Sequence, residues 1–173
     1  MPSPTLTGFE QKVIVGVADL AVTNNRDIVL ITYSLGSCIG MTIYDPISHV
    51  GGLLHAMLPD SALDPGKATV QPAMFVDTGL LALFHAAGKL KAEKERVQIC
   101  VAGAAQILDG SEVFSIGRRN HDAIARSLEE QRLAILAEQV GGLVSRTMYL
   151  NLRNGEVRLR VSGQSSEVTL CKN

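Results

Sequence analysis

Residues 32–59 read TYSLGSCIGMTIYDPISHVGGLLHAMLP, in which two apolar segments are joined by the turn-forming pair Asp45-Pro46. Two apolar runs joined by such a turn former predict a β-hairpin. Cys38 precedes the first segment and His55 lies on the returning one, so this hairpin can bring the two residues into contact. The small residues around Cys38 permit close approach to its sulfur, and the pairing is typical of a thiol nucleophile with a histidine base.

A structural interpretation of the same residues stays open at this point. A buried cysteine and a histidine on an apolar strand are structural in most proteins. Threonine is a favoured strand residue, so Thr32 can also be explained by its place in a strand. The three cysteines have no paired spacing, so we expect no disulfide framework; Cys100 is interpreted as a buried apolar residue and Cys171 as terminal and non-catalytic. No histidine has metal-ligand spacing with a cysteine, and we expect no metal and no cofactor.

Composition favours one compact domain. The chain has 173 residues, of which 46% are hydrophobic, and a formal net charge of −1 with both signs interspersed. That charge pattern gives no reason to expect nucleic-acid binding or an electrostatic membrane anchor. The N-terminal residues lack a signal-peptide pattern, and no apolar run is long enough to span a bilayer. We therefore expect a cytoplasmic protein without membrane insertion.

Hydrophobic periodicity predicts a mixed α/β (α+β) domain with antiparallel hairpins. The expected strands are 13–18, 28–33, 39–44, 50–57, 97–102, 133–140, 144–152 and 156–161, and the expected helices are 72–88 and 120–131. Asn154-Gly155 indicates a type I′ turn, and the polar loop 59–71 is a candidate lid. We expect a flexible segment at 1–12, the domain at 13–163 and a tail at 164–173.

The frame LGSC…D…GG…H..LP within residues 35–59 resembles the CheD family of bacterial chemotaxis proteins, and the resemblance extends over roughly 15–161. Further motifs recur in the order of that family: Phe75-Val76-Asp77, Gly103-Ala104, IGRRN at 116–120 and Gly141-Gly142 ahead of Arg146. Two positions depart from the family pattern, where Ala102 and Ser145 replace glycines. Both concern the backbone at the rim of the site rather than the nucleophile.

The resemblance implies a single domain with a β-sandwich-like core and flanking helices. It also implies a glutamine deamidase that acts on chemoreceptors, with Cys38, His55 and Thr32 in the positions of the family's catalytic residues. In such a reaction Cys38 forms a thioester, His55 transfers protons, and the Thr32 hydroxyl accepts a hydrogen bond that orients the imidazole. Chemoreceptors are the expected partners, and a CheC phosphatase is a second expected partner.

Further candidates surround this trio. The turn at Gly36 and Ser37 can supply backbone amides to the tetrahedral intermediate. Arg119, Asn120 and Gly103 are candidates for substrate or partner binding. For Asn120 the alternative is a role as the N-cap of the helix expected from residue 120, and for Arg119 it is a contact with a backbone carbonyl.

Two other functions fit the same sequence. The domain could be a non-catalytic adaptor or regulator that binds chemoreceptors and a CheC-type phosphatase. Another cysteine hydrolase, such as a peptidase or a transglutaminase, would share the nucleophile but differ in acceptor.

Overall fold

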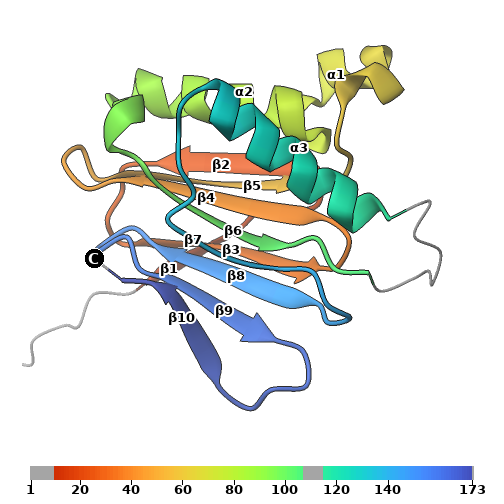
Figure 1. Ribbon diagram of the computed structural model, residues 1–173. Coiled ribbons are helices and arrows are strands. Elements are labelled where there is room, and N and C mark those ends of the chain that lie inside the picture. Colours follow the sequence, from red (N-terminus) through yellow and green to blue (C-terminus); the bar gives the residue numbers. More distant parts are fainter. Residues whose placement is uncertain (1–9, 107–114, 173) are drawn as a thin grey trace, which may run out of the picture.

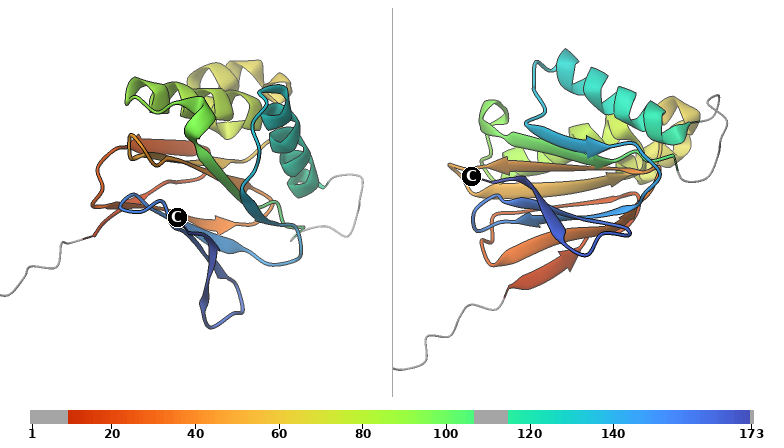
Figure 2. Two further views of the ribbon diagram at one scale, coloured as in Figure 1. Left: turned by 60° about the vertical axis from the view of Figure 1, so that its left-hand side comes forward. Right: turned by 60° about the horizontal axis from the view of Figure 1, so that its bottom comes forward.

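The computed structural model describes residues 10–106 and 115–172, within which ten strands form two five-stranded sheets. The sheets stack face to face, and the helices cover the outer face of one of them (Figures 1 and 2). The expected α+β domain with a sandwich-like core is thereby confirmed.

Sheet A has one solvated face. In spatial order it contains β1 (Gln11–Ile14), β3 (Ile28–Leu35), β8 (Arg146–Asn151), β9 (Val157–Val161) and β10 (Glu167–Cys171). β1 runs parallel to β3, and the remaining neighbours are antiparallel. Residues of β8 and β9 alternate between buried and more exposed, as expected when one face packs on a core and the other meets water.

Sheet B is covered on both faces. In spatial order it contains β2 (Asp19–Thr23), β5 (Val50–Ala56), β4 (Ile39–Asp45), β6 (Gln98–Gly103) and β7 (Ala137–Val140). β6 and β7 are parallel, and the other neighbours are antiparallel. Every residue of β4 and β5 is buried, because sheet A lies on one face and the helices on the other. The nearly continuous apolar runs of these strands reflect this double coverage.

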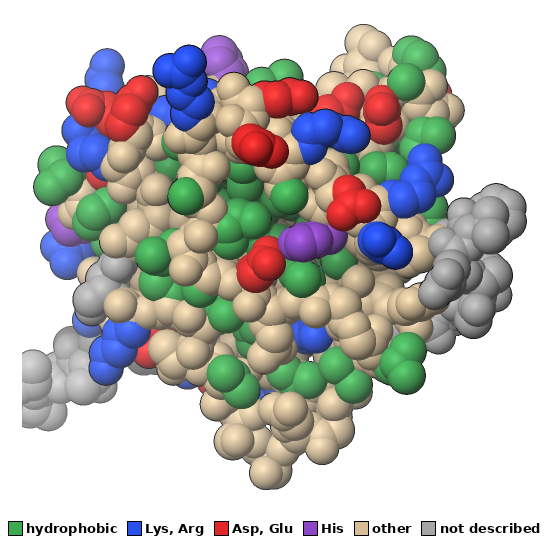
Figure 3. All heavy atoms as spheres, viewed as in Figure 1, with side chains coloured by type: hydrophobic (Ala, Val, Ile, Leu, Met, Phe, Trp, Pro, Cys, Tyr) green, Lys and Arg blue, Asp and Glu red, His purple; other side chains and the backbone are tan. Residues whose placement is uncertain are grey.

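Two long helices form the outer layer over sheet B, α2 (Val76–Lys89) and α3 (Ile116–Glu130). The shorter helical elements are η1 (Ser61–Leu63), α1 (Pro65–Val70), η2 (Pro72–Met74) and η3 (Lys94–Arg96). On the face shown in Figure 3, acidic and basic side chains intermix over this helical layer. None of the helices in the described part of the chain is long and apolar enough to cross a membrane.

The N-terminal strands differ from the sequence prediction. The strand predicted over 13–18 ends at Ile14, and the chain then crosses from sheet A to sheet B, where β2 follows. Ala18 adopts a left-handed conformation with φ 59° at this crossing, and its amide donates to the His55 carbonyl at 2.9 Å. A crossing between sheets depends on long-range contacts, which the local pattern does not contain.

Several boundaries also differ. The predicted loop 59–71 contains η1 and α1, the strand predicted from residue 133 begins at Ala137, and α3 begins four residues before the predicted start. Only Gly155 in the turn between β8 and β9 has a positive φ, so the type I′ prediction is wrong, since that turn needs two such residues.

Both predicted end segments contribute to sheet A. Within the expected tail 164–173, β10 pairs with β9, which places Cys171 in a strand. Residues 1–9 of the expected N-terminal segment lie outside the described residues, and residues 11 and 12 of that segment belong to β1.

Candidate active site

Cys38 lies in a tight turn between β3 and β4. Ser34 has a left-handed φ of 57°, and the Gly36 amide donates back to the Ser34 carbonyl at 2.8 Å. The far side of the turn is held by the end of β6, where Ala104 N donates to Cys38 O at 2.7 Å and Ala105 N donates to Gly36 O at 2.8 Å. The cysteine is half-buried and packs against the apolar cluster between the sheets.

His55 is fully buried on β5 and faces the same inter-sheet core. It is the ladder partner of Gly40, which lies two residues after Cys38. The β4–β5 hairpin predicted from the sequence is therefore present, with Cys38 at its open end and His55 near the end of the returning strand.

Thr32 contacts His55 from the other sheet. Its Oγ1 lies 2.6 Å from His55 Nδ1 and donates its only proton to the Val15 carbonyl at 2.7 Å. The Thr32 oxygen must therefore accept from Nδ1–H, which leaves Nε2 of the neutral imidazole with its lone pair. The structure thus joins Thr32 and His55 as expected, and Thr32 lies on β3 of the facing sheet.

Burial keeps both titrating groups neutral. Desolvation lowers the pKa of His55 to about 4 and raises the pKa of the Cys38 thiol, an effect opposed by a hydrogen bond from the Cys38 backbone amide. Near pH 7 the resting site consequently holds a thiol and a neutral imidazole. His55 Nε2 has no hydrogen-bond partner among the described residues, so its lone pair is available to accept a proton.

Not all of the backbone amides expected to donate to the tetrahedral intermediate are free of other hydrogen bonds. Because the Gly36 amide is bonded to the Ser34 carbonyl, it is not available to a substrate oxygen. The remaining candidate donors in the turn are the Ser37 amide and the Cys38 amide, which interacts with the thiol of its own residue in the resting site. The part of Ser37 in binding the oxyanion stays a prediction.

Gly103 supports the turn from behind. Its φ of +104° is unfavourable for other residues, and a Cβ there would lie 2.5 Å from the Cys38 carbonyl oxygen. Arg146 donates to the Gly103 carbonyl at 3.3 Å and to Gln139 Oε1 at 2.9 Å. Gly103 therefore contacts the backbone that carries Cys38, while its predicted part in substrate or partner binding stays a prediction.

Asn120 and Arg119 lie on α3 in very different environments. The N-cap of α3 is Ser115, whose side chain accepts from Arg118 N, so the alternative reading of Asn120 as an N-cap is wrong. Asn120 is fully buried, and its Nδ2 donates to Ser37 O at 2.9 Å and to Met57 O at 3.0 Å. Arg119 is exposed and lines a cavity of about 280 Å³.

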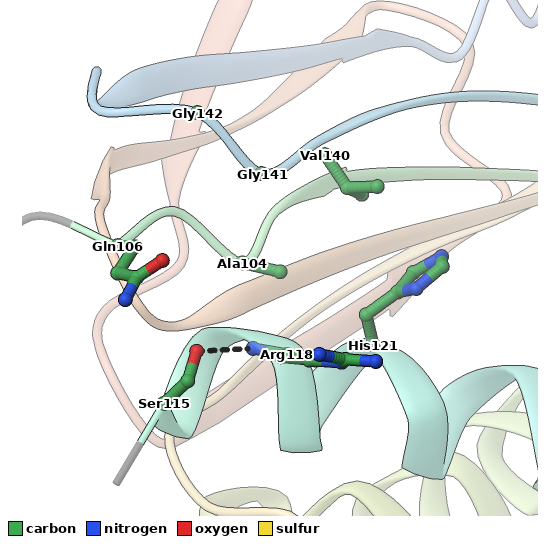
Figure 4. A pocket seen from close by; sticks show the side chains of 8 residues that line it. All are labelled: Ala104, Gln106, Ser115, Arg118, His121, Val140, Gly141 and Gly142. Atoms are coloured by element: carbon green, nitrogen blue, oxygen red, sulfur yellow. Dashed lines mark hydrogen bonds between the residues drawn. The ribbon is translucent and has the colours of Figure 1, made fainter. Parts of the chain in front are cut away.

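A second cavity, of about 220 Å³, lies next to the turn that carries Cys38. Ala104 lines this cavity, and its backbone amide donates to Cys38 O. Figure 4 shows Arg118 and His121 on α3 and, on the other side of the cavity that they line, Ala104 at the end of β6 and the Gly141-Gly142 turn. His121 Nε2 lies 2.9 Å from Glu138 Oε2. In the described part of the chain, no group of three or more His, Cys, Asp or Glu residues could hold a metal ion.

Sequence reasoning missed two contributors. The Val15 carbonyl fixes the Thr32 proton, and the Met57 carbonyl anchors Asn120. Both act through backbone oxygen, so their side chains give no signal. The IGRRN motif was the available signal for Asn120.

Fold and site together define a class: an α+β sandwich that holds a cysteine, a histidine and a threonine against its inter-sheet core. Comparison with known proteins shows which family of this class the chain resembles. The sequence profile described as CheD chemotactic sensory transduction matches residues 57–161. A Syntrophus aciditrophicus protein named as a probable chemoreceptor glutamine deamidase, CheD 1, is 44% identical over 87% of this chain and 94% of its own.

Two further relatives carry the name probable chemoreceptor glutamine deamidase CheD. The Solibacter usitatus protein is 41% identical over 91% of this chain and 94% of its own, and the Pyrococcus horikoshii protein is 42% identical over 87% and 92%. The chain belongs to the CheD family. A match of 151 residues within a chain of 173 necessarily includes residues 32–59, which carry the candidate site.

Proposed function

We propose that this protein hydrolyses selected glutamine side chains of chemoreceptors to glutamate in chemotaxis. Family membership and the names of the relatives support this activity and substrate class. The observation that carries the chemistry is the 2.6 Å contact between Thr32 Oγ1 and His55 Nδ1. It leaves Nε2 as the basic nitrogen on the same hairpin as Cys38.

In the first half-reaction, Sγ of Cys38 attacks the carboxamide carbon while its proton passes to His55 Nε2. Proton transfer accompanies attack because the resting pair is neutral. The C–N bond of the tetrahedral intermediate then breaks, and the imidazolium gives its proton to the departing nitrogen. Ammonia leaves, and the substrate carbonyl remains bound to Cys38 as a thioester.

In the second half-reaction, water attacks the thioester carbon and His55 accepts one of its protons. The C–S bond breaks, and the sulfur takes the proton back from the imidazolium. One glutamine side chain and one water thus yield one carboxylic acid side chain and one ammonia, with Cys38 and His55 restored, and the acid then ionises to glutamate by releasing its proton. The amides of Ser37 and Cys38 are the candidate donors to the negatively charged oxygen in both steps.

The product places a carboxylate where the receptor had a neutral amide. On packed receptor helices, added negative charge changes the repulsion between neighbouring side chains and can shift the signalling state. We include in this proposal a cytoplasmic location, where the receptors' signalling helices lie, and a CheC-type phosphatase as regulatory partner.

The test is peptide mass spectrometry of purified chemoreceptor cytoplasmic fragments incubated with wild type, with Cys38→Ala and with Cys171→Ala. Cys171 is half-buried like Cys38, so its substitution is a matched control for loss of a thiol. Glutamine-to-glutamate conversion by wild type and Cys171→Ala, but not by folded Cys38→Ala, is the expected result. Conversion by Cys38→Ala would reject the thioester mechanism, and no conversion by any folded, reduced protein would favour the adaptor. Incorporation of an added labelled amine would indicate transamidation.

A further inference from the structure

Asn120 is a buried side chain whose orientation is fixed by its partners. Its Nδ2 contacts two carbonyl oxygens, Ser37 O at 2.9 Å and Met57 O at 3.0 Å. Only the NH₂ group of an asparagine can donate, so the reverse orientation would place oxygen against oxygen. The side chain therefore forms a two-point clamp between the nucleophile turn and the chain that leaves β5.

Among the described residues, the Ser37 carbonyl is the one carbonyl of the turn to which no backbone amide donates, and Asn120 holds it. The carbonyls of Gly36 and Cys38 accept from backbone amides at the end of β6, whereas the Ser37 carbonyl between them accepts from Asn120. In a planar trans peptide, a carbonyl oxygen and the following N–H point in opposite directions. Fixing the Ser37 carbonyl therefore also aims the Cys38 N–H, the candidate donor beside the sulfur.

The second contact ties this peptide to the strand that carries the base. Ile39 and Ala56 form the last pair of the β4–β5 ladder, so Cys38 and Met57 lie just beyond its end. Asn120 spans the gap by bonding to Ser37 and to Met57, two residues after His55.

A glycine at the start of α3 allows the helix to lie close enough for Asn120 to reach both carbonyls. Gly117 lies one turn before Asn120 on the same face, and a Cβ there would lie 2.6 Å from the carbonyl oxygens of Ala104 and Ala105. The absence of a side chain lets the helix sit directly on the end of β6.

We propose that Asn120 is a positioning residue for the deamidation reaction. Its two hydrogen bonds set the position of the Cys38 amide and thiol relative to His55. This inference rests on the proposed function. It assigns Asn120 no contact with the substrate and distinguishes it from an ordinary core residue of α3.

Three variants test the clamp: Asn120→Asp keeps the shape but removes both donors, Asn120→Ala removes the side chain, and Leu128→Ala is the control. Leu128 is buried on the same helix in the core beneath α2 and α3, so its truncation destabilises the fold without touching the turn. The readouts are kcat and KM on a receptor fragment, thermal unfolding, and the rate at which iodoacetamide alkylates Cys38, followed at peptide level.

Both Asn120 variants should lower kcat by about 100-fold with KM within about threefold of wild type, because misplacement of reacting groups acts on the chemical step. Alkylation of Cys38 at pH 7 should accelerate at least about threefold, since a loosened turn exposes the thiol. Leu128→Ala should lower the unfolding temperature but leave kcat within about threefold.

Folded Asn120 variants with kcat near wild type would overturn the proposal, as would an equal loss of kcat in Leu128→Ala. If Asn120→Ala does not fold, Asn120→Asp decides; if neither folds, the residue is structural and the proposal fails. Alkylation needs no receptor, so it keeps the test independent of the proposed function. Faster alkylation together with a wild type that converts no glutamine would reject the proposed function and retain only the inference that Asn120 fixes the turn that carries Cys38.

Discussion

His55 should make the protein acid-labile in a defined pH window. Its pKa is about 4 in the folded protein and near 6.5 when exposed, so between these values the unfolded chain binds a proton that the folded chain does not. Stability therefore falls as pH decreases through this window. At about 1.4 kcal/mol per pH unit, the loss is about 2 kcal/mol at pH 5 and about 3 kcal/mol at pH 4, relative to pH 7.

The assay is urea unfolding of wild type, His55→Gln and His85→Gln at pH 7, 5 and 4. Glutamine cannot titrate, so the free energy of unfolding of His55→Gln should lose about 3 kcal/mol less than wild type between pH 7 and pH 4. His85 is exposed on α2, and its substitution should leave the wild-type pH dependence in place. Equal acid losses in wild type and His55→Gln would refute the assignment of a buried neutral imidazole.

Three further predictions concern the residues around the site and the far end of its hairpin. In the deamidation assay, Thr32→Val should lower kcat roughly 100-fold because it removes the acceptor for His55 Nδ1–H. The kcat of Thr32→Ser, which keeps the hydroxyl, should stay within about tenfold of wild type, and equal kcat values for the two variants would contradict the orienting role of Thr32. Gly103→Ala should cost at least about 1–3 kcal/mol in thermal unfolding because of its positive φ and the clash with Cys38 O, and an unchanged unfolding temperature would argue against it. Asp45→Ala should cost about 3 kcal/mol in urea unfolding, since the buried carboxylate pairs with Arg96 at 2.7 Å and accepts from three backbone amides; a loss below about 1 kcal/mol would show that the network contributes little.

The hairpin that carries Cys38 and His55 could be predicted because its information is local. A turn former between two apolar segments specifies β4 and β5, and the small residues before β4 mark the turn that carries Cys38. Thr32 is different, since a threonine in a strand carries no signal of its own. Its contact with His55 crosses between sheets and was expected only from the resemblance to the CheD family.

Other errors had physical causes. The pattern over 13–18 continues smoothly through the point where the chain changes sheets, so one strand was predicted where the chain leaves β1 toward β2. Asn120 was considered as a cap because it precedes a clear amphipathic pattern, yet α3 begins earlier and buries this polar residue. Its two acceptors lie 83 and 63 residues away in the sequence, beyond any local pattern.

The division of the site between two sheets has a consequence for folding. A hairpin forms locally, within about 1–10 μs in isolation, so the thiol and the imidazole can meet early. Thr32 reaches His55 only after sheet A docks on sheet B, a slower event that requires long-range contacts. A newly made chain with one assembled sheet would hold Cys38 and His55 without the Thr32 contact that orients the imidazole. Under the proposed mechanism, receptors would therefore be modified only by copies that have completed the sandwich.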